Sequence, residues 1–450
     1  MKKLEQHILT LAFAAVWTAC SPSDDTLPAA FSEQAIQLAP RVERPETRAG
    51  VKGNMDYRGI VQTGFGVFAY ATGGADYSDA AVPSLFCNKQ VSYTGETAAA
   101  DVQNPLELYY YFGNWSYVDT DTPLKYWPAT DKISFYGYAP YVGSADFNKT
   151  GDTGIINVVP ADGETAGDPK VTYVISTQPG KAVDLLWGVN QTTKLPWRDQ
   201  TLETTGGPIL MTFHHALSAI GFHVQAIVDK DNVLSDFTDE SNVANLLGES
   251  GDYKITINQL ELTGDETSGN KGTFYHKGVL NLNSTEVVSG KPIAKWESLE
   301  DEDATLTVAN GDVKAALRHP AAADAETIMT TATLTGVTQT AQQTLVADDS
   351  DNELNFMVIP HSAADYKLVL DWYISGKAPD GTYIQEYRTS TIKISDWELQ
   401  SNVKYYINLV IGLKTLRLNV TATDWQDEET DVEVLVEHGT SASSSLARKR

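Results

Sequence analysis

A long series of short strand patterns is the feature of this sequence that most limits its fold. From Gly59 onward, apolar or aromatic residues alternate with small or polar ones, and Gly, Pro, Asn and Asp separate the segments. A period of two is typical of strands with one buried face, and no long amphipathic helix pattern interrupts the series. The sequence therefore predicts an all-β protein. The predicted strands are Gly64–Ala71, Tyr109–Trp115, Ile133–Ala139, Ile209–Phe213, Ile220–Val228, Tyr253–Leu262, Gly272–Leu282, Ala304–Val308, Glu353–Ile359, Tyr366–Ile374, Tyr383–Ile394 and Tyr405–Val420.

The length of the chain predicts more than one folded unit. At 450 residues it exceeds what one compact core usually contains. The least strand-like stretch of the body, Asp231–Gly251, is the expected connection. We therefore expect two antiparallel β-sandwich domains in tandem, an N-terminal one over residues 49–235 and a C-terminal one over residues 236–438. Residues 439–450 are of low complexity and are expected to form a disordered tail.

Residues 1–20 have the layout of an export signal. Two lysines precede the apolar run Ile8–Trp17, which is too short to span a bilayer as a stable helix. The run ends in Thr18, Ala19 and Cys20, as in a bacterial lipoprotein signal that is cleaved before an acylated cysteine. Trp17 stands where such signals usually carry Leu, so an ordinary signal peptide with an incidental cysteine is the alternative. We expect Cys20 to be the lipidation site.

Residues 21–48 resemble a leader or propeptide more than a domain. Ile36 and Leu38 lie on one face of a weak strand pattern, which two prolines end. Of the arginines that follow, Arg44 precedes a proline, which blocks trypsin-like cleavage, whereas Arg48 precedes Ala49 in an exposed-looking context. The Arg48–Ala49 bond is the expected cleavage point.

Charge and cysteine content exclude several classes of partner. A formal net charge of −26 repels nucleic acid and anionic lipid headgroups. Cys20 and Cys87 are the only cysteines, so no intramolecular disulfide framework is available once Cys20 carries lipid. Cys87 is expected to be a small buried side chain.

Patterns that would carry catalysis, a metal or a cofactor are weak in this sequence. His215 and His223 are separated by roughly 26 Å on a straight strand, too far to bind one ion. Gly64-Phe65-Gly66 lacks the third glycine and the helix of a nucleotide site, and no Gly-x-Ser-x-Gly elbow occurs. Acidic runs such as Glu300–Asp303 are typical of solvated loops, and Asp348–Asp351 lacks the calcium loop of an EF-hand. We expect no enzymatic activity, no metal and no cofactor.

Several short segments together resemble those of a known family. They are Cys20 after the signal, Arg48 at the end of the leader, Gly66–Ala69, Asp184–Gly188, Phe213–Ile220, Tyr405–Leu409 and Val420–Trp425. In order and spacing, this set resembles the fimbrillin family of Bacteroidetes, the subunits of type V pili and their surface-lipoprotein relatives. The resemblance spans nearly the whole chain.

The resemblance implies a fold, a location and a mode of assembly. It implies transthyretin-like sandwich domains and export to the cell surface as a lipoprotein held in the outer membrane by palmitate or a similar acyl group on Cys20. A trypsin-like protease would cut between Arg48 and Ala49, and the leader, with Ile36 and Leu38 filling a groove, would leave. A strand from another pilin subunit would then enter the groove. The product would be a fimbrium that serves adhesion to a host or bacterial surface ligand.

The strand that a neighbouring subunit would donate is expected near the C-terminus. Thr430–Glu437 alternates Val432, Val434 and Val436 with polar or acidic residues. Such a segment suits β-augmentation, in which main-chain hydrogen bonds give affinity and alternate side chains give register. The same pattern equally suits an ordinary last strand of its own domain, and both interpretations stay open.

A surface lipoprotein that binds glycans without polymerising is the alternative function. Trp115, Trp127 and Trp197 lie among Asn and Pro in loop-like contexts, where exposed rings can stack on sugars. In that interpretation these three tryptophans are the binding residues.

Overall fold

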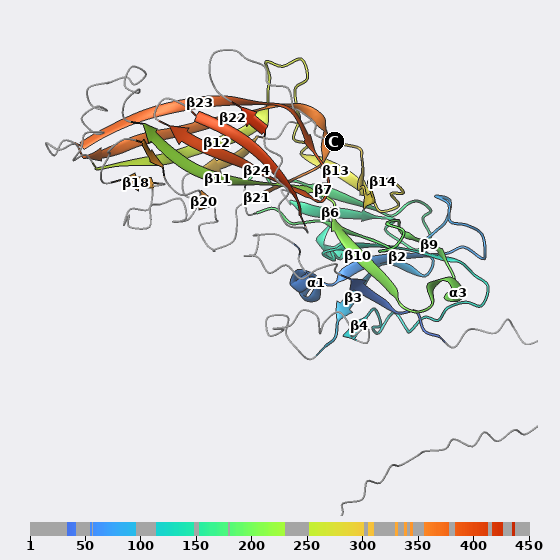
Figure 1. Cartoon of the computed structure of the whole chain (residues 1–450). Coiled ribbons are helices and arrows are strands. Elements are labelled where there is room, and N and C mark those ends of the chain that lie inside the picture. Colours follow the sequence, from blue (N-terminus) through green and yellow to red (C-terminus); the bar gives the residue numbers. More distant parts are fainter. Residues whose placement is uncertain are drawn as a thin grey trace, which may run out of the picture.

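The structure is a computed structural model of the chain. It describes residues 34–41, 55, 57–95, 114–147, 153–178, 181–229, 252–300, 305–309, 329–331, 337–339, 343–344, 355–377, 383–412, 416–425 and 434–436. Nearly all regular structure in these residues is strand, as the alternating patterns predict. The described chain is elongated, with β2 to β10 at one end and β11, β12 and β22 to β24 at the other (Figure 1).

An eight-stranded sheet, here called the first sheet, contains the predicted leader strand at one edge. Its order is β1-β10-β8-β5-β2-β3-β4, with β9 added to β5. All its pairs are antiparallel except β1 with β10, which are parallel. The strands are β1 (Leu38–Arg41), β2 (Phe65–Ala71), β3 (Phe86–Tyr93), β4 (Trp115–Ser116), β5 (Ile133–Ala139), β8 (Leu186–Val189), β9 (Trp197–Gln200) and β10 (Ile209–His215).

Packing against a neighbouring ring explains the glycine at position 66 in β2. Phe65 and Val67 point into the core on one side of the first sheet, and Phe68 and Tyr70 into the core on the other. A Cβ on Gly66 would lie 2.3 Å from the ring of Tyr138 on the neighbouring β5, so only glycine lets this ring lie flat against the strand.

Four further sheets complete the described fold. A four-stranded sheet has the order β16-β13-β7-β6, a seven-stranded one β19-β11-β24-β25-β26, a five-stranded one β17-β12-β22-β23, and β14 pairs with β15. Within the seven-stranded sheet β20 and β21 also pair with β11, and β18 pairs with β12 in the five-stranded sheet. The pair β11 and β24 is parallel.

The remaining elements have the following bounds. The strands are β6 (Gly154–Val159), β7 (Lys170–Val174), β11 (Ser218–Asp229), β12 (Asp252–Gly264), β13 (Lys277–Asn281), β14 (Val287–Val288), β15 (Lys291–Pro292), β16 (Lys295–Glu297), β17 (Leu306–Ala309), β18 (Met329–Thr331), β19 (Val337–Gln339), β20 (Gln343–Thr344), β21 (Asn355–Val358), β22 (His361–Lys377), β23 (Tyr383–Leu399), β24 (Val403–Gly412), β25 (Leu416–Asp424) and β26 (Val434–Val436). The helical turns are α1 (Tyr57–Thr63), the 3-10 turn η3 (Ser144–Asp146) and α3 (Leu202–Thr205).

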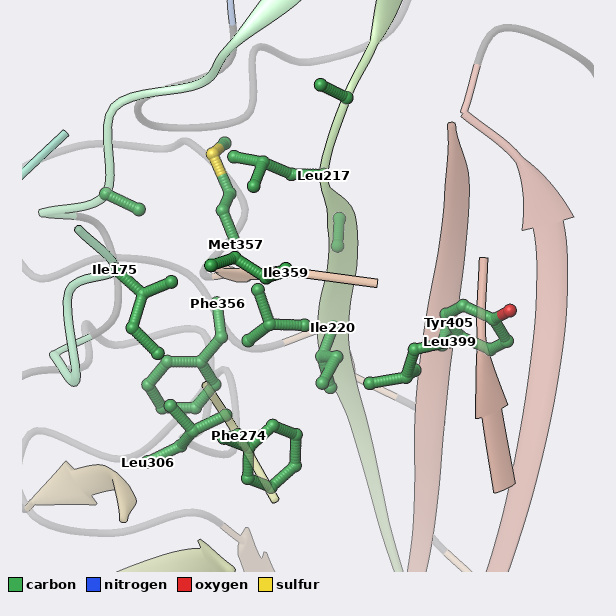
Figure 2. Packing of buried hydrophobic residues seen from close by; sticks show 14 of the residues in the cluster. Ile175, Leu217, Ile220, Phe274, Leu306, Phe356, Met357, Ile359, Leu399 and Tyr405 are labelled. Carbon is green, nitrogen blue, oxygen red and sulfur yellow. The ribbon is translucent and has the colours of Figure 1, made fainter. Parts of the chain in front are cut away.

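Two hydrophobic cores share the buried side chains. The smaller one lies on the face of the first sheet that β1 and α1 border, and it includes Ile36, Leu38 and Ile60. The larger one starts at the opposite face and continues without a break into the other end of the molecule. Figure 2 shows it where Leu217 and Ile220 lie among side chains from other parts of the chain, such as Phe356 on β21 and Ile359 just after it.

The change from one end to the other comes early in the chain. β10 lies in the first sheet, and β11 lies in the seven-stranded sheet, so the change of sheet occurs at Ala216 and Leu217, before the predicted boundary at residues 235 and 236. Beyond that boundary, β13 pairs with β7 of the predicted first domain. The two-domain division therefore remains a prediction. The pairing of β13 with β7 joins residues that it assigns to different domains.

Candidate functional site

The leader segment is a strand added to the open edge of the first sheet. β1 runs parallel to β10, with Leu38 opposite Ile209 and Arg41 opposite Thr212. The amide of Ile209 donates to the carbonyl of Gln37 at 2.9 Å, which extends the contact one residue before β1. Without β1, β10 would be the edge strand of the described sheet.

A second segment holds the leader from the other side. The amide of Ile36 donates to the carbonyl of Lys125 at 2.9 Å, and the amide of Trp127 donates to the carbonyl of Gln34 at 3.0 Å. Ala35 and Tyr126 form an antiparallel bridge between these two contacts. We call β10 together with Lys125–Trp127 the leader site, because the leader lies between them.

The hydroxyl of Tyr117 ties the two sides of this site together. It donates to the carbonyl of Ile36 at 3.0 Å and accepts from the amide of Lys125 at 3.1 Å. Burial raises the pKa of Tyr117, which keeps its hydroxyl protonated as a donor at neutral pH. Sequence reasoning missed Tyr117 and Lys125, which carry no motif, and it named Trp127 only as a candidate sugar-binding residue.

Alternate leader side chains enter the smaller core. Ile36 and Leu38 are 1% and 2% exposed, whereas Gln37 between them is exposed. Full burial of two such side chains is worth roughly 3–6 kcal/mol by area. The leader is thus held by apolar burial as well as by main-chain hydrogen bonds on two sides.

The other sequence-predicted assembly residues are placed only in part. Cys20, Arg48, Ala49 and Val432 lie outside the described residues. Val434 and Val436 belong to β26, which pairs antiparallel with β25, Val434 opposite Val420 and Val436 opposite Leu418. In this structure the C-terminal strand therefore lies in a sheet of its own chain.

The expectation that the three loop tryptophans are exposed is wrong for two of them. Trp127 is 0% exposed and packs against Phe135, and Trp115 in β4 is 8% exposed. Trp197 in β9 is half-buried, and its Nε1 donates to the carbonyl of Leu210 at 3.1 Å. The segments around them follow turn-rich sequence but fold back over the smaller core, so Trp115 and Trp127 present no open ring face for a sugar.

The histidines considered as metal ligands serve other contacts. His215 is buried, and its Nδ1 lies 2.7 Å from Oδ2 of Asp184, which also accepts from the amide of Met55 at 2.9 Å. Its ring stacks on Trp425 at 3.9 Å between centroids. His223 stacks on Tyr406 in the same way, at 4.2 Å.

Two kinds of feature are absent from the described residues. Within those ranges no group of His, Cys, Asp or Glu side chains is arranged to hold a metal ion. None of the described helices has the length and hydropathy needed to cross a membrane.

A match to a protein-family model shows which family this chain belongs to. A family model described as fimbrillin-like matches residues 47–289, more than half of the chain. The chain belongs to the fimbrillin-like family. The matched region of this fimbrillin-like protein starts within the leader region and includes all of the first sheet except β1.

The similar solved structures include proteins from two Bacteroides species. A fimbrial protein from Bacteroides vulgatus is 19% identical, with a TM-score of 0.51, and the match covers 87% of this chain and 100% of that one. A protein titled as a candidate cell adhesion protein from Bacteroides ovatus is 13% identical, with a TM-score of 0.39, over 89% of this chain and 100% of that one. Among proteins with curated descriptions, none matches this fimbrillin-like chain.

Proposed function

We propose that this protein is a structural subunit of a cell-surface pilus or adhesion fibre, and that it assembles by exchange of the leader strand. In this proposal it reaches the outer membrane as a lipoprotein on Cys20. A trypsin-like protease cuts after Arg48, and the leader leaves with its lipid. A strand from another subunit then fills the leader site, and the resulting fibre serves adhesion.

The observation that carries this proposal is the position of the leader between β10 and Lys125–Trp127. The leader is covalently joined to the body only through residues 42–54, which contain Arg48. Cleavage there leaves a peptide held by hydrogen bonds and by two buried side chains, Ile36 and Leu38. A replacement strand that makes the same contacts can displace it without any change in the rest of the first sheet.

Loss of the leader would leave a site that favours a new strand. The freed groups would include the amides of Ile209 and Trp127 and the carbonyl of Lys125, and part of the smaller core would meet water. An unpaired sheet edge of this kind is a template for another chain. Because the contact joins two different surfaces, it is heterologous, and such contacts propagate as a filament when the rotation between subunits does not close a ring.

The segment Thr430–Glu437 is the proposed donor. Its three valines at alternate positions suit the sites that Ile36 and Leu38 occupy. To be donated, β26 must first leave β25, to which three of its residues are paired. A three-residue pairing at a sheet edge is a small barrier compared with loss of a central strand.

Limited trypsin treatment of the purified precursor tests the proposal. We expect cleavage after Arg48, loss of the leader from the body and a ladder of oligomers on a gel of samples that have not been boiled. Arg48→Ala combined with Lys52→Ala, which removes the other trypsin site of this segment, should abolish both the cut and the ladder. N-terminal sequencing of protein from the cell surface should give Ala49 for the mature chain.

Arg41→Ala is the matched control. Arg41 lies in β1, paired with Thr212, and a residue held in a sheet is a poor protease site. This variant should cleave and assemble as the unaltered chain does. A cleaved body that has lost its leader and stays monomeric would contradict assembly by strand exchange.

A further inference from the structure

The five-stranded sheet ends in a long strand whose outer side has no partner strand within the described residues. β23 lies at the end of the order β17-β12-β22-β23 and pairs there with β22 alone. In Figure 1 it forms the outer border of its end of the molecule. An edge strand of this length offers a row of main-chain groups to another chain.

Most of this edge is regular enough to pair again. From Tyr383 to Ile394, β23 keeps one continuous register with β22, and the shifts in register fall closer to His361. Edges are usually protected by bulges or prolines, and this stretch of β23 contains neither.

The side chains of this stretch alternate in a self-complementary way. Tyr387 is 65% exposed, the largest exposed fraction among the large hydrophobic residues, and its ring lies 5.1 Å from that of Tyr373 on β22. Glu386 and Arg388 flank it in sequence and both lie on the opposite face of the sheet, half-buried. When two copies of this strand meet antiparallel about Tyr387, the acidic residue before it in one copy lies opposite the basic residue after it in the other.

We infer that the β23 edge is an interface between two copies of this chain, paired antiparallel about a two-fold axis at Tyr387. In that register Glu386 of each copy lies opposite Arg388 of the other, and the two Tyr387 side chains face each other. Directly opposed side chains in such pairs are about 4.5–5.5 Å apart at Cβ, close enough for both contacts. The interface is isologous, so it closes as a dimer.

The charges select this register over its neighbours. A two-fold axis at Glu386 would place two carboxylates opposite each other, and an axis at Arg388 would place two guanidinium groups opposite each other. Like charges directly across a strand pair are unfavourable, whereas opposite charges and aromatic pairs are favourable. Of these three registers, only the one centred on Tyr387 gives two opposite-charge pairs.

This contact lies on a different sheet from the leader site. It is independent of leader cleavage and of the proposed polymerisation. In a fibre it would join neighbouring filaments side by side, and many weak copies of it would act together.

Charge reversal in the uncleaved chain tests the inference by sedimentation equilibrium at physiological ionic strength. The unaltered chain should show a reversible monomer–dimer equilibrium. Glu386→Arg and Arg388→Glu should each raise the Kd of the dimer by about tenfold or more, because each replaces two favourable pairs with two like-charge pairs. The double variant Glu386→Arg with Arg388→Glu should regain the original Kd.

An equimolar mixture of the two single variants gives the sharpest result. Each variant then meets opposite charges only in the other, so a heterodimer should form where neither variant dimerises alone. Circular dichroism and melting temperature check that all variants fold. If a charge variant does not fold, Tyr387→Lys replaces it and should be monomeric. A monomeric unaltered chain, unchanged single variants or an unrescued mixture would each overturn the inference.

Discussion

Two large leader side chains, Ile36 and Leu38, give apolar contacts that help to hold β1 in place. Both are buried in the smaller core, while Gln37 between them is exposed. Truncation of a buried leucine typically costs about 2–5 kcal/mol, because a cavity adds to the lost transfer free energy.

Leu38→Ala should therefore release the leader faster once the chain is cut. The measurement is the amount of leader peptide that co-purifies with the cleaved body, followed over time by mass spectrometry. Gln37→Ala is the matched control, since the carbonyl of Gln37 keeps its hydrogen bond to Ile209. Equal retention of the leader in both variants would show that burial of Leu38 does not hold it.

Asp184 links Met55, which follows the proposed cleavage site, to both ends of the molecule. It is fully buried and accepts from Met55 and pairs with His215, whose ring stacks on Trp425 near the end of β25. Asp184→Ala should lower the free energy of unfolding by about 1–3 kcal/mol, because it leaves the hydrogen-bonding groups of His215 and Met55 without their partner.

Denaturant unfolding measures the loss of stability in Asp184→Ala, and Asp424→Ala is the control variant. Asp424 pairs with Lys291 at the surface, and loss of such a pair costs about 1 kcal/mol or less. A smaller loss for Asp184→Ala than for Asp424→Ala would mean that the buried pair does not join the two ends.

Single residues show where sequence reasoning reaches its limit. Ile36 and Leu38 follow from alternation alone, because a period of two reveals one face of a strand whatever its partner. Trp115 and Trp127 do not, because neighbouring Asn and Pro reveal a loop but not whether that loop covers a core. Asp184 and His215 are distant in sequence from Met55 and Trp425, and nothing local indicates that they meet.

At the scale of elements, Glu297 joins three strands of the four-stranded sheet. Its carboxylate accepts from Lys170 on β7 and Asn281 on β13, and it pairs with Lys295 on its own strand β16. Burial alone would raise the pKa of Glu297, but these partners outweigh burial and lower it to about 2.

This shift predicts an acid-sensitive contribution to stability. The folded pKa lies below the ordinary value of 4.5, so the contribution is present above that value and is lost as pH falls toward 2. We expect about 1 kcal/mol, since the partners are partly exposed and screened. Glu297→Gln should flatten the decline in unfolding free energy between these pH values, whereas an unchanged decline would contradict the assignment.

Strand positions were easier to predict than strand partners. The pattern at Ile133–Ala139 coincides with β5, because both ends of that alternation are marked by turn residues. Tyr405–Val420 was predicted as one strand and is β24 followed by β25, because the apolar alternation resumes directly after Gly412. The parallel pairing of β1 with β10 joins residues far apart in sequence, and alternation carries no information about such a partner.

At the scale of the whole molecule, the leader site and the proposed donor lie on different sheets. β1 belongs to the first sheet, and β26 belongs to the seven-stranded sheet. A continuous hydrophobic core runs between these sheets, so one subunit can present an acceptor at one place and a donor at another without losing its own fold. In such an arrangement each subunit has an acceptor site and a separate donor strand.

Two variants that each block one end should therefore form a dimer and stop. Arg48→Ala with Lys52→Ala keeps the leader in the acceptor and retains Thr430–Glu437. A chain ending at Asp427 can lose its leader but has no donor. Neither should form ladders alone after trypsin treatment. Mixed in equal amounts, they should give one new band at the size of a dimer, because the only free donor then meets the only free acceptor. If the segment is instead an ordinary last strand, the shortened chain should show a lower melting temperature, and the mixture should contain no dimer.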